Sequence, residues 1–101
     1  DGLINWHESA EQIHNLVRAM NPSPVAYTFW QNEILKINET IKTSDRSGIR
    51  PGIVLKINKE GILVSTGTND ILIKKMKPQG KPEMSASAWA NGARVKPGDK
   101  F

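Results

Sequence analysis

The side chains that could carry out acid–base or metal chemistry are few in this chain and poorly spaced for it. The only histidines, His7 and His14, lie seven positions apart without a carboxylate cluster at ligand spacing, and the chain has no cysteine. We therefore expect no metal site and interpret both histidines as surface or helix-rim residues. Ser65, Ser85 and Ser87 have no nucleophile-elbow context. The sequence predicts no catalytic residue, and a free-standing enzyme is the least favoured function.

Positive charge is the more informative feature. Residues 51–101 contain nine Lys or Arg and four Asp or Glu, a net charge of +5, whereas residues 1–50 contain five and six, a net charge of −1. A concentrated positive field attracts polyanions, because each neutralised phosphate releases condensed counterions. Solvated surface lysines would explain the same surplus, so composition alone leaves nucleic-acid binding and an ordinary surface both open.

The candidates for phosphate contacts lie on the outer side of the second expected strand, in the polar loop after it, and near the end of the fifth strand. They are Lys36, Lys42, Arg46, Arg50, Lys74, Lys75, Lys77 and Lys81. The large aromatic residues are expected to pack in the core rather than to stack on bases, because large aromatics dominate small cores. The basic residues would then hold the phosphates of a folded, double-helical nucleic acid.

Length and composition place the chain among ordinary single domains. It has 101 residues, 38% of them hydrophobic and 24% charged, with no apolar run long enough to span a membrane. The absence of cysteine suits a reducing compartment, so we expect a cytoplasmic protein. We also expect a monomer. Because the chain opens with Asp1 and Gly2, without an initiator methionine, we expect a processed chain or a domain of something longer.

Hydrophobic periodicity places one helix before the basic half. Ala10, Ile13, Leu16, Val17 and Met20 recur at helical spacing over residues 8–20. Ser9 and Gln12 have the spacing of a capping box, and Glu8 and Glu11 lie where the helix dipole favours negative charge. A turn at residues 21–24, which includes Pro22 and Pro24, should end this helix.

The following pattern has period two and predicts five strands, at residues 25–30, 33–43, 52–58, 62–66 and 71–77. In the second strand, Leu35, Ile37 and Ile41 should face inward, and Thr40 outward. Gly61 should supply a positive φ in a tight hairpin turn. Ser85 is expected to cap a short helix that ends near Asn91, with Gly92 as its left-handed stop.

Short strands joined by hairpin-length turns favour an antiparallel arrangement over a parallel sheet. We therefore predict a mostly β fold with short helices: a small, open Greek-key β-barrel of the oligonucleotide-binding type, preceded by one amphipathic helix. The whole chain would form one domain. It would comprise a leading segment, helix and proline turn (1–24), the barrel (25–82), and a short helix and tail (83–101).

Several blocks of sequence resemble one known family. They are Ile4-Asn5-Trp6, Ala10-Glu11-x-Ile13, residues 18–28 with Asn21-Pro22-x-Pro24, Gly61-Ile62-Leu63-Val64-x-Thr66-Gly67, Met84-Ser85-Ala86, and Gly92 followed by Pro97-Gly98-Asp99. Their order and spacing are similar to the C-terminal domain of methionyl-tRNA formyltransferase along almost the whole chain. His7 and Ser23 depart from that pattern where members often have a small capping residue and Trp.

The resemblance implies a role without chemistry of its own. Such a domain helps hold initiator methionyl-tRNA while an N-terminal catalytic domain of the same chain formylates it from 10-formyltetrahydrofolate. That catalytic domain is not present here, so no catalytic residue is carried over and this domain needs no cofactor. The resemblance leaves one alternative: a structural C-terminal domain, as in formyltetrahydrofolate dehydrogenase or sugar formyltransferases, which packs on its catalytic domain without binding nucleic acid.

Overall fold

A computed structural model describes residues 2–19 and 26–101 of the chain. Within these residues the fold is mostly β, as predicted, with two short helices. In chain order the elements are α1 (Ala10–Ala19), β1 (Tyr27–Trp30), β2 (Glu33–Lys42), β3 (Val54–Asn58), β4 (Gly61–Val64), β5 (Ile71–Pro78), β6 (Met84–Ser85) and α2 (Ala86–Ala93). The two-residue strand β6 was not predicted, because it is too short to show an alternating pattern.

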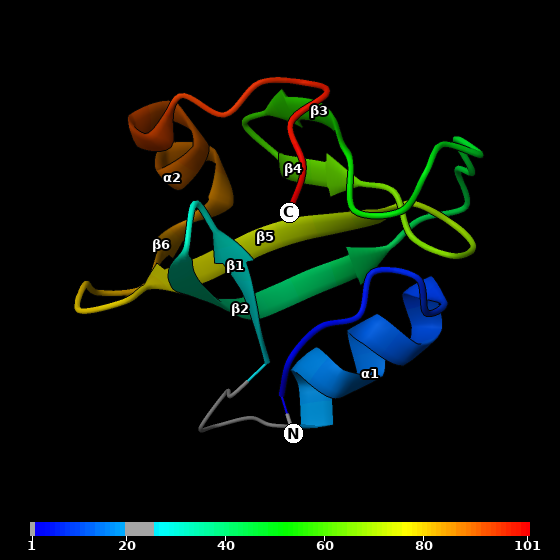
Figure 1. Cartoon of the computed structure of the whole chain (residues 1–101), viewed down its shortest axis with the longest axis horizontal. Helices are drawn as coiled ribbons and strands as arrows, with labels where there is room; N and C mark the ends of the chain where they lie inside the picture. The colour runs from blue at the N-terminus through cyan, green and yellow to red at the C-terminus, as the bar shows by residue number, and fades with distance from the viewer. Residues whose placement is uncertain (1, 20–25) are drawn as a thin grey trace.

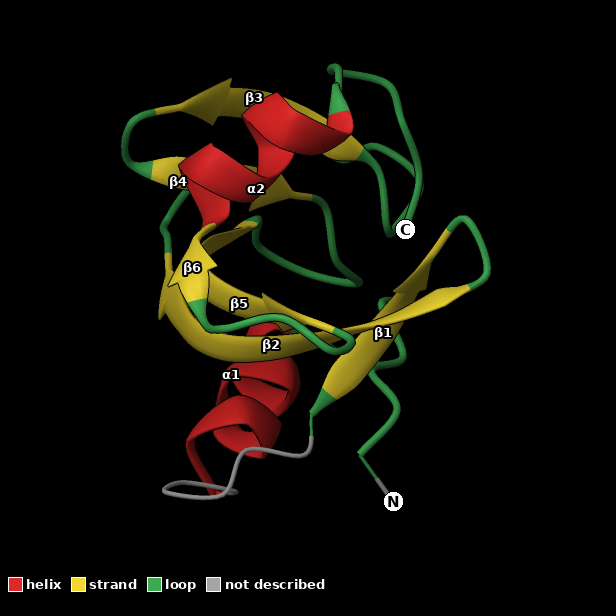
Figure 2. Cartoon of the chain, turned by 90° about the vertical axis from the view of Figure 1, so that its left-hand side faces the viewer, coloured by secondary structure: helices red, strands yellow, loops and turns green. Residues whose placement is uncertain are grey.

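The strands form one open antiparallel sheet in the order β1-β2-β5-β4-β3, with β6 paired to β5. Three consecutive strands, β3 to β5, are joined by short turns, and β2 lies beside β5 after a long connection to β3. This is the Greek-key order that the sequence predicted. Helix α1 lies below β2, whereas α2, β3 and β4 lie above β2 and β5 (Figure 1), and the turned view separates the two helices in the same way (Figure 2).

Both outer edges of the sheet are covered by the ends of the described chain. Near the N-terminus, Ile4 N–H donates to the Tyr27 carbonyl, and Tyr27 N–H donates to the Gly2 carbonyl, each at 2.8 Å. Near the C-terminus, Val54 N–H donates to the Asp99 carbonyl at 2.8 Å, and Phe101 N–H donates to Gly52 at 2.9 Å. These bonds satisfy backbone groups that an open edge would otherwise offer to another chain.

Helix α1 begins as the capping box predicted. Gln12 N–H donates to Ser9 Oγ, and Ser9 N–H donates back to Gln12 Oε1, both at 3.0 Å. The helix buries Ala10, Ile13 and Val17, and full burial of a side chain of the size of Val or Ile stabilises the fold by about 1.5–3 kcal/mol. The predicted contribution of Met20 and the proline turn at residues 21–24 lie outside the described residues.

Strand β2 corrects one predicted inward face. Leu35 and Ile37 are buried as expected, but Ile41 is 44% exposed and Thr40 is 5% exposed. The pairing of β2 with β5 shifts register on both sides of Glu39. Odd-numbered residues of β2 are buried before these shifts, and the even-numbered Thr40 is buried after them. Thr40 is thereby directed into the fold, where its hydroxyl shares a 2.9 Å hydrogen bond with Nδ1 of His14.

Helix α2 begins as predicted and ends differently. Ser85 Oγ accepts from Ala88 N–H at 3.0 Å, which confirms the N-cap. Gly92, predicted as the left-handed stop, lies inside the helix instead. Arg94 takes the left-handed position with φ 57°, and its N–H bonds back to the helix. The helix continues past Gly92 because Ala93 can still pack at the edge of the core.

Aromatic packing ties the elements together. Phe101 lies 5.6 Å from Trp6, 5.4 Å from Trp30 and 6.1 Å from Trp89, measured between ring centroids. Trp6 Nε1 also donates to Thr28 Oγ1 at 3.1 Å. The prediction of aromatic packing is therefore confirmed for the three tryptophans, whereas Phe29 is 47% exposed and does not follow it.

Candidate nucleic-acid interface

Two predicted cations come together on the outer face of the sheet. Lys36 in β2 lies directly opposite Lys77 in β5, and Tyr27 in β1 lies opposite Lys36 on its other side. Directly opposed residues of antiparallel strands project from the same face, with Cβ atoms about 4.5–5.5 Å apart. No acid of the described residues forms an ion pair with either lysine. We call Lys36 and Lys77 the lysine pair.

Two other predicted cations have acidic partners. Lys74 Nζ lies 3.5 Å from Glu60 Oε1, and its side chain is partly buried. Lys75 Nζ lies 3.7 Å from Glu39 Oε1 on the exposed surface. Surface ion pairs of this kind contribute only about 0–1 kcal/mol, so both lysines could exchange partners. Their charge is nevertheless partly neutralised, which makes them weaker candidates for phosphate contacts than the lysine pair.

A second cationic group lies at the other end of β2. Lys42 ends the strand, six residues and therefore about 20 Å beyond Lys36. Arg46 and Arg50 follow in the exposed loop that leads to β3. The predicted cations thus form a group at each end of β2 and not one continuous stripe.

The loop that carries the two arginines is fastened by a buried carboxylate. Asp70 is 3% exposed. Its oxygens accept from Ser47 N–H at 3.0 Å and from Ser47 Oγ at 2.8 Å, and its own N–H donates to the Asp45 carbonyl at 2.8 Å. The Thr43 hydroxyl donates to the Asp70 carbonyl at 2.7 Å. These bonds hold the start of the loop against β5 and so give Arg46 a defined position.

Lys42 also acts on the nearest histidine. Burial lowers the pKa of His14 below its ordinary value, the positive charges of Lys42 and Arg18 lower it further, and Glu11 opposes them. His14 therefore tends to stay neutral beside Thr40. This contact joins an imidazole to a hydroxyl, and the Thr40 side chain is buried.

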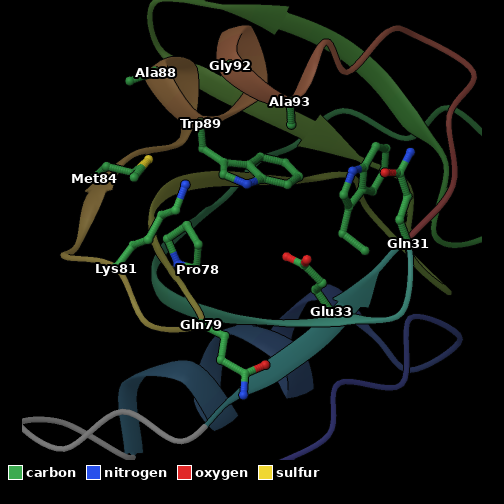
Figure 3. A pocket seen from close by; sticks show the side chains of 11 residues that line it. Gln31, Glu33, Pro78, Gln79, Lys81, Met84, Ala88, Trp89, Gly92 and Ala93 are labelled. Atoms are coloured by element: carbon green, nitrogen blue, oxygen red, sulfur yellow. The ribbon is translucent and has the colours of Figure 1, made fainter.

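Lys81 lies apart from the lysine pair, at a cleft of about 400 Å³ between the β1–β2 turn, the β5–β6 loop and α2. Figure 3 shows the Lys81 and Glu33 side chains directed into this space, with the indole of Trp89 above them. A carboxylate and an ammonium group thus line the same cleft. The cleft is therefore mixed in character, and Lys81 is a weaker phosphate candidate than the lysine pair.

Two kinds of feature are absent from the described residues. No group of three or more His, Cys, Asp or Glu residues within 2–19 and 26–101 could hold a metal ion. In the same part of the chain, neither helix is long and apolar enough to cross a membrane. What the interface can do is electrostatic: it can bind anions through lysine and arginine side chains.

Comparison with known proteins gives the family. The profile described as "Formyl transferase, C-terminal domain" matches residues 1–94. The chain belongs to this family. Curated relatives named methionyl-tRNA formyltransferase include one from Desulforamulus reducens, 44% identical over 95% of this chain, and one from Streptococcus gordonii, 42% identical over 97%. The chain spans only 31% and 32% of their respective lengths.

Solved structures of another protein contain a similar fold. A variant of HypX from Aquifex aeolicus matches 98% of this chain and 19% of its own, with a TM-score of 0.76 and 14% identity. HypX in complex with tetrahydrofolic acid matches 97% of this chain and 18% of its own, with a TM-score of 0.74 and 17% identity. At these identities the likeness concerns the fold alone.

Sequence reasoning did not single out two features of this interface. The opposition of Lys36 and Lys77 depends on the pairing of strands that are far apart in sequence, so no local pattern could reveal it. The exposure of Phe29 had no signal in the sequence either, since Tyr27 and Phe29 share the more apolar-looking strand face, opposite to Thr28. Thr28 is buried, so the two rings project from the outer side.

Proposed function

We propose that this chain is the tRNA-binding C-terminal domain of a methionyl-tRNA formyltransferase. It helps hold initiator methionyl-tRNA for translation initiation while an N-terminal catalytic domain of the same polypeptide formylates the amino group from 10-formyltetrahydrofolate. The observation that carries the proposal is the 42–44% identity, over 95–97% of this chain, to proteins named methionyl-tRNA formyltransferase. The family assignment and the formyltransferase relatives support the domain arrangement.

The unpaired charge of the lysine pair supports an RNA partner. The lysine pair has no acidic partner among the described residues, and Lys42, about 20 Å further along β2, is exposed, as are Arg46 and Arg50 in the loop after it. Each phosphate that such a cation neutralises releases condensed counterions and so adds to the affinity. Such contacts position the RNA and carry little sequence information.

The chemistry is assigned to the catalytic domain, not to this chain. The proposal gives this chain no catalytic residue, no metal and no cofactor of its own. The proposal also places the protein in the cytoplasm and makes it a monomer. Size-exclusion chromatography of the 101-residue chain tests the monomer directly. A stable dimer at micromolar concentration would contradict the monomer.

Titration with initiator tRNA tests the proposal. If about four phosphates are neutralised, the logarithm of the binding constant should fall with a slope of magnitude about 3–4 against the logarithm of salt concentration. Fluorescence anisotropy of labelled tRNA, recorded between about 50 and 200 mM salt, measures the binding constant. Any tag on the chain should be uncharged, so that it adds no phosphate contact of its own. Binding that does not depend on salt, or no binding at the lowest salt, contradicts an electrostatic tRNA-binding role.

A purely structural domain is the second candidate, and the separation of the cations into two groups favours it. In that case the chain would pack on the catalytic domain and shape its cleft without touching RNA. The two functions differ in one readout. A structural domain leaves tRNA affinity of the full-length enzyme unchanged when the lysine pair is neutralised, whereas a tRNA-binding domain lowers it.

A further inference from the structure

One exposed and one half-buried aromatic ring, Phe29 and Tyr27, lie next to the lysine pair on the outer face of the sheet. Tyr27 is opposite Lys36, and Phe29 is opposite Ile34, so cross-strand register places all four side chains on one face of the β1–β2 hairpin. The rings of Tyr27 and Phe29 meet edge to face, with centroids 5.7 Å apart. We call these two residues the aromatic platform.

Core packing does not explain the platform. Phe29 is 47% exposed, whereas Trp6 and Trp89 on the other side of the sheet are 7% and 9% exposed. The edge-to-face contact with Tyr27 fixes the orientation of the Phe29 ring and leaves much of its surface in water. A partly ordered, exposed aromatic ring is suited to stacking, because little side-chain freedom remains to be lost on binding.

The neighbouring charges favour a nucleotide over a protein as the occupant. Two lysines directly opposed across a sheet repel each other, and a bound phosphate would relieve that repulsion. Two acids of this part of the sheet already have partners: Glu39 pairs with Lys75 at 3.7 Å, and Glu83 accepts from Asn38 Nδ2 at 2.6 Å. A single nucleotide supplies both the flat apolar base and the phosphate that the face lacks.

We propose that the aromatic platform stacks an unpaired base of the bound RNA, with the adjoining phosphate held by the lysine pair. This inference rests on the proposed RNA-binding function and adds the class of nucleotide that this face takes. Because every base has a π-face, the contact selects for unpaired nucleotides and not for a particular sequence. A base within a duplex is stacked on its neighbours and is not available to the platform.

Two labelled RNA probes distinguish stacking from phosphate binding. One is a single-stranded oligouridylate of about ten nucleotides, and the other is a blunt RNA duplex of the same length. Phe29→Leu keeps the apolar bulk and removes the ring. We expect it to weaken binding of the single strand about 5- to 150-fold, with duplex binding changed less than about twofold. Phe29→Trp should restore single-strand binding, because indole stacks as well as phenyl does.

Matched controls separate the platform from general effects. Ile41 is a similarly exposed apolar residue of β2, 44% exposed, and Ile41→Leu should leave both probes unaffected. Lys36→Gln should weaken both probes and reduce both salt slopes by about 0.7–0.9. Thermal unfolding of each variant shows whether it is folded, and the Phe29→Trp chain keeps the test valid if Phe29→Leu is destabilised.

Each outcome of these binding experiments supports or contradicts a stated proposal. Selective loss of single-strand binding in Phe29→Leu with recovery in Phe29→Trp supports the platform. If Lys36→Gln weakens both probes but Phe29→Leu weakens neither, the platform is wrong, the RNA-binding function stands, and the face is free to bind protein. Equal loss on both probes in Phe29→Leu also contradicts stacking. If the unmodified chain binds neither probe at low salt, the proposed function itself fails.

Discussion

Lys36 and Lys77 face each other in register across β2 and β5, and no acid of the described residues pairs with either. Like charges directly opposed in a sheet destabilise it. By contrast, the neighbouring Lys75 has Glu39 at 3.7 Å. The lysine pair therefore opposes folding, whereas the charge of Lys75 is compensated. Such an uncompensated pair is typical of a site that a bound ligand completes.

The lysine pair should therefore affect stability and RNA binding in opposite directions. Lys77→Gln removes the repulsion, and we expect it to raise the free energy of unfolding by about 0.2–1 kcal/mol at low salt. Urea denaturation measures this change. The matched control is Lys75→Gln, which breaks an ion pair and should lower stability by about 0–1 kcal/mol. A loss of stability in Lys77→Gln at low salt would show that the two charges do not repel each other appreciably.

The Asp70 carboxylate should hold the loop that carries Arg46 and Arg50. Asp70→Ala leaves Ser47 N–H and its hydroxyl without their acceptor, so we expect a loss of about 1.5–3 kcal/mol in the free energy of unfolding and weaker tRNA binding. Chemical denaturation and tRNA titration measure the two effects. Ser47→Ala removes only the hydroxyl bond and should lose about 1 kcal/mol. Unchanged stability in Asp70→Ala would mean that the loop is held by other contacts.

His14 should make stability depend on pH. Burial first, then Lys42 and Arg18, lower its pKa in the folded chain below the ordinary value of 6.5. The unfolded chain therefore takes up the proton more readily. The contribution of neutral His14 is fully present above about pH 6.5 and is lost as pH falls through the lower, folded-state pKa.

Urea denaturation at about pH 7.5 and about pH 5.5 measures this dependence. We expect the His14→Gln variant to lose less stability between these pH values than the unmodified chain, since Gln can bond to Thr40 but does not titrate there. A His7→Gln chain keeps the His14 site and is the matched control. An equal pH dependence with and without His14 would assign the effect to other groups.

Gly61 should tolerate a side chain much less well than Gly80 does. Its φ is +139°, and a Cβ at this position would run into the backbone carbonyl of Ile73. Gly80 also has a positive φ, +76°, but its Cβ would meet nothing within 4 Å. We expect Gly80→Ala to lose about 1–2 kcal/mol from backbone strain alone and Gly61→Ala to lose clearly more. Equal losses, measured by denaturation, would show that the strand can shift to admit the methyl group.

The sequence predicted features that depend on neighbours along the chain. Ser9 and Gln12 form the predicted capping box, Ser85 caps α2, and Gly61 has the predicted positive φ. Each of these depends on a few consecutive residues and on well-understood backbone geometry. For the same reason the existence and order of the five longer strands could be predicted.

Features that depend on pairing between distant segments could not be predicted. The register shifts around Glu39 reverse the inward side of β2, and nothing near Thr40 or Ile41 announces them. The left-handed end of α2 falls on Arg94 and not on Gly92, because the helix gains packing by continuing. The candidate site has the same origin, since Lys36 and Lys77 become neighbours only through the pairing of β2 with β5.

The salt dependence of initiator tRNA binding, with and without the lysine pair, tests the central claim most directly. A chain with both Lys36→Gln and Lys77→Gln should bind more weakly, and its slope against the logarithm of salt concentration should be smaller by about 1.5, since two phosphate contacts are lost. A chain with Lys75→Gln should change far less. Identical slopes and affinities in all three chains would contradict a role for the lysine pair in holding RNA.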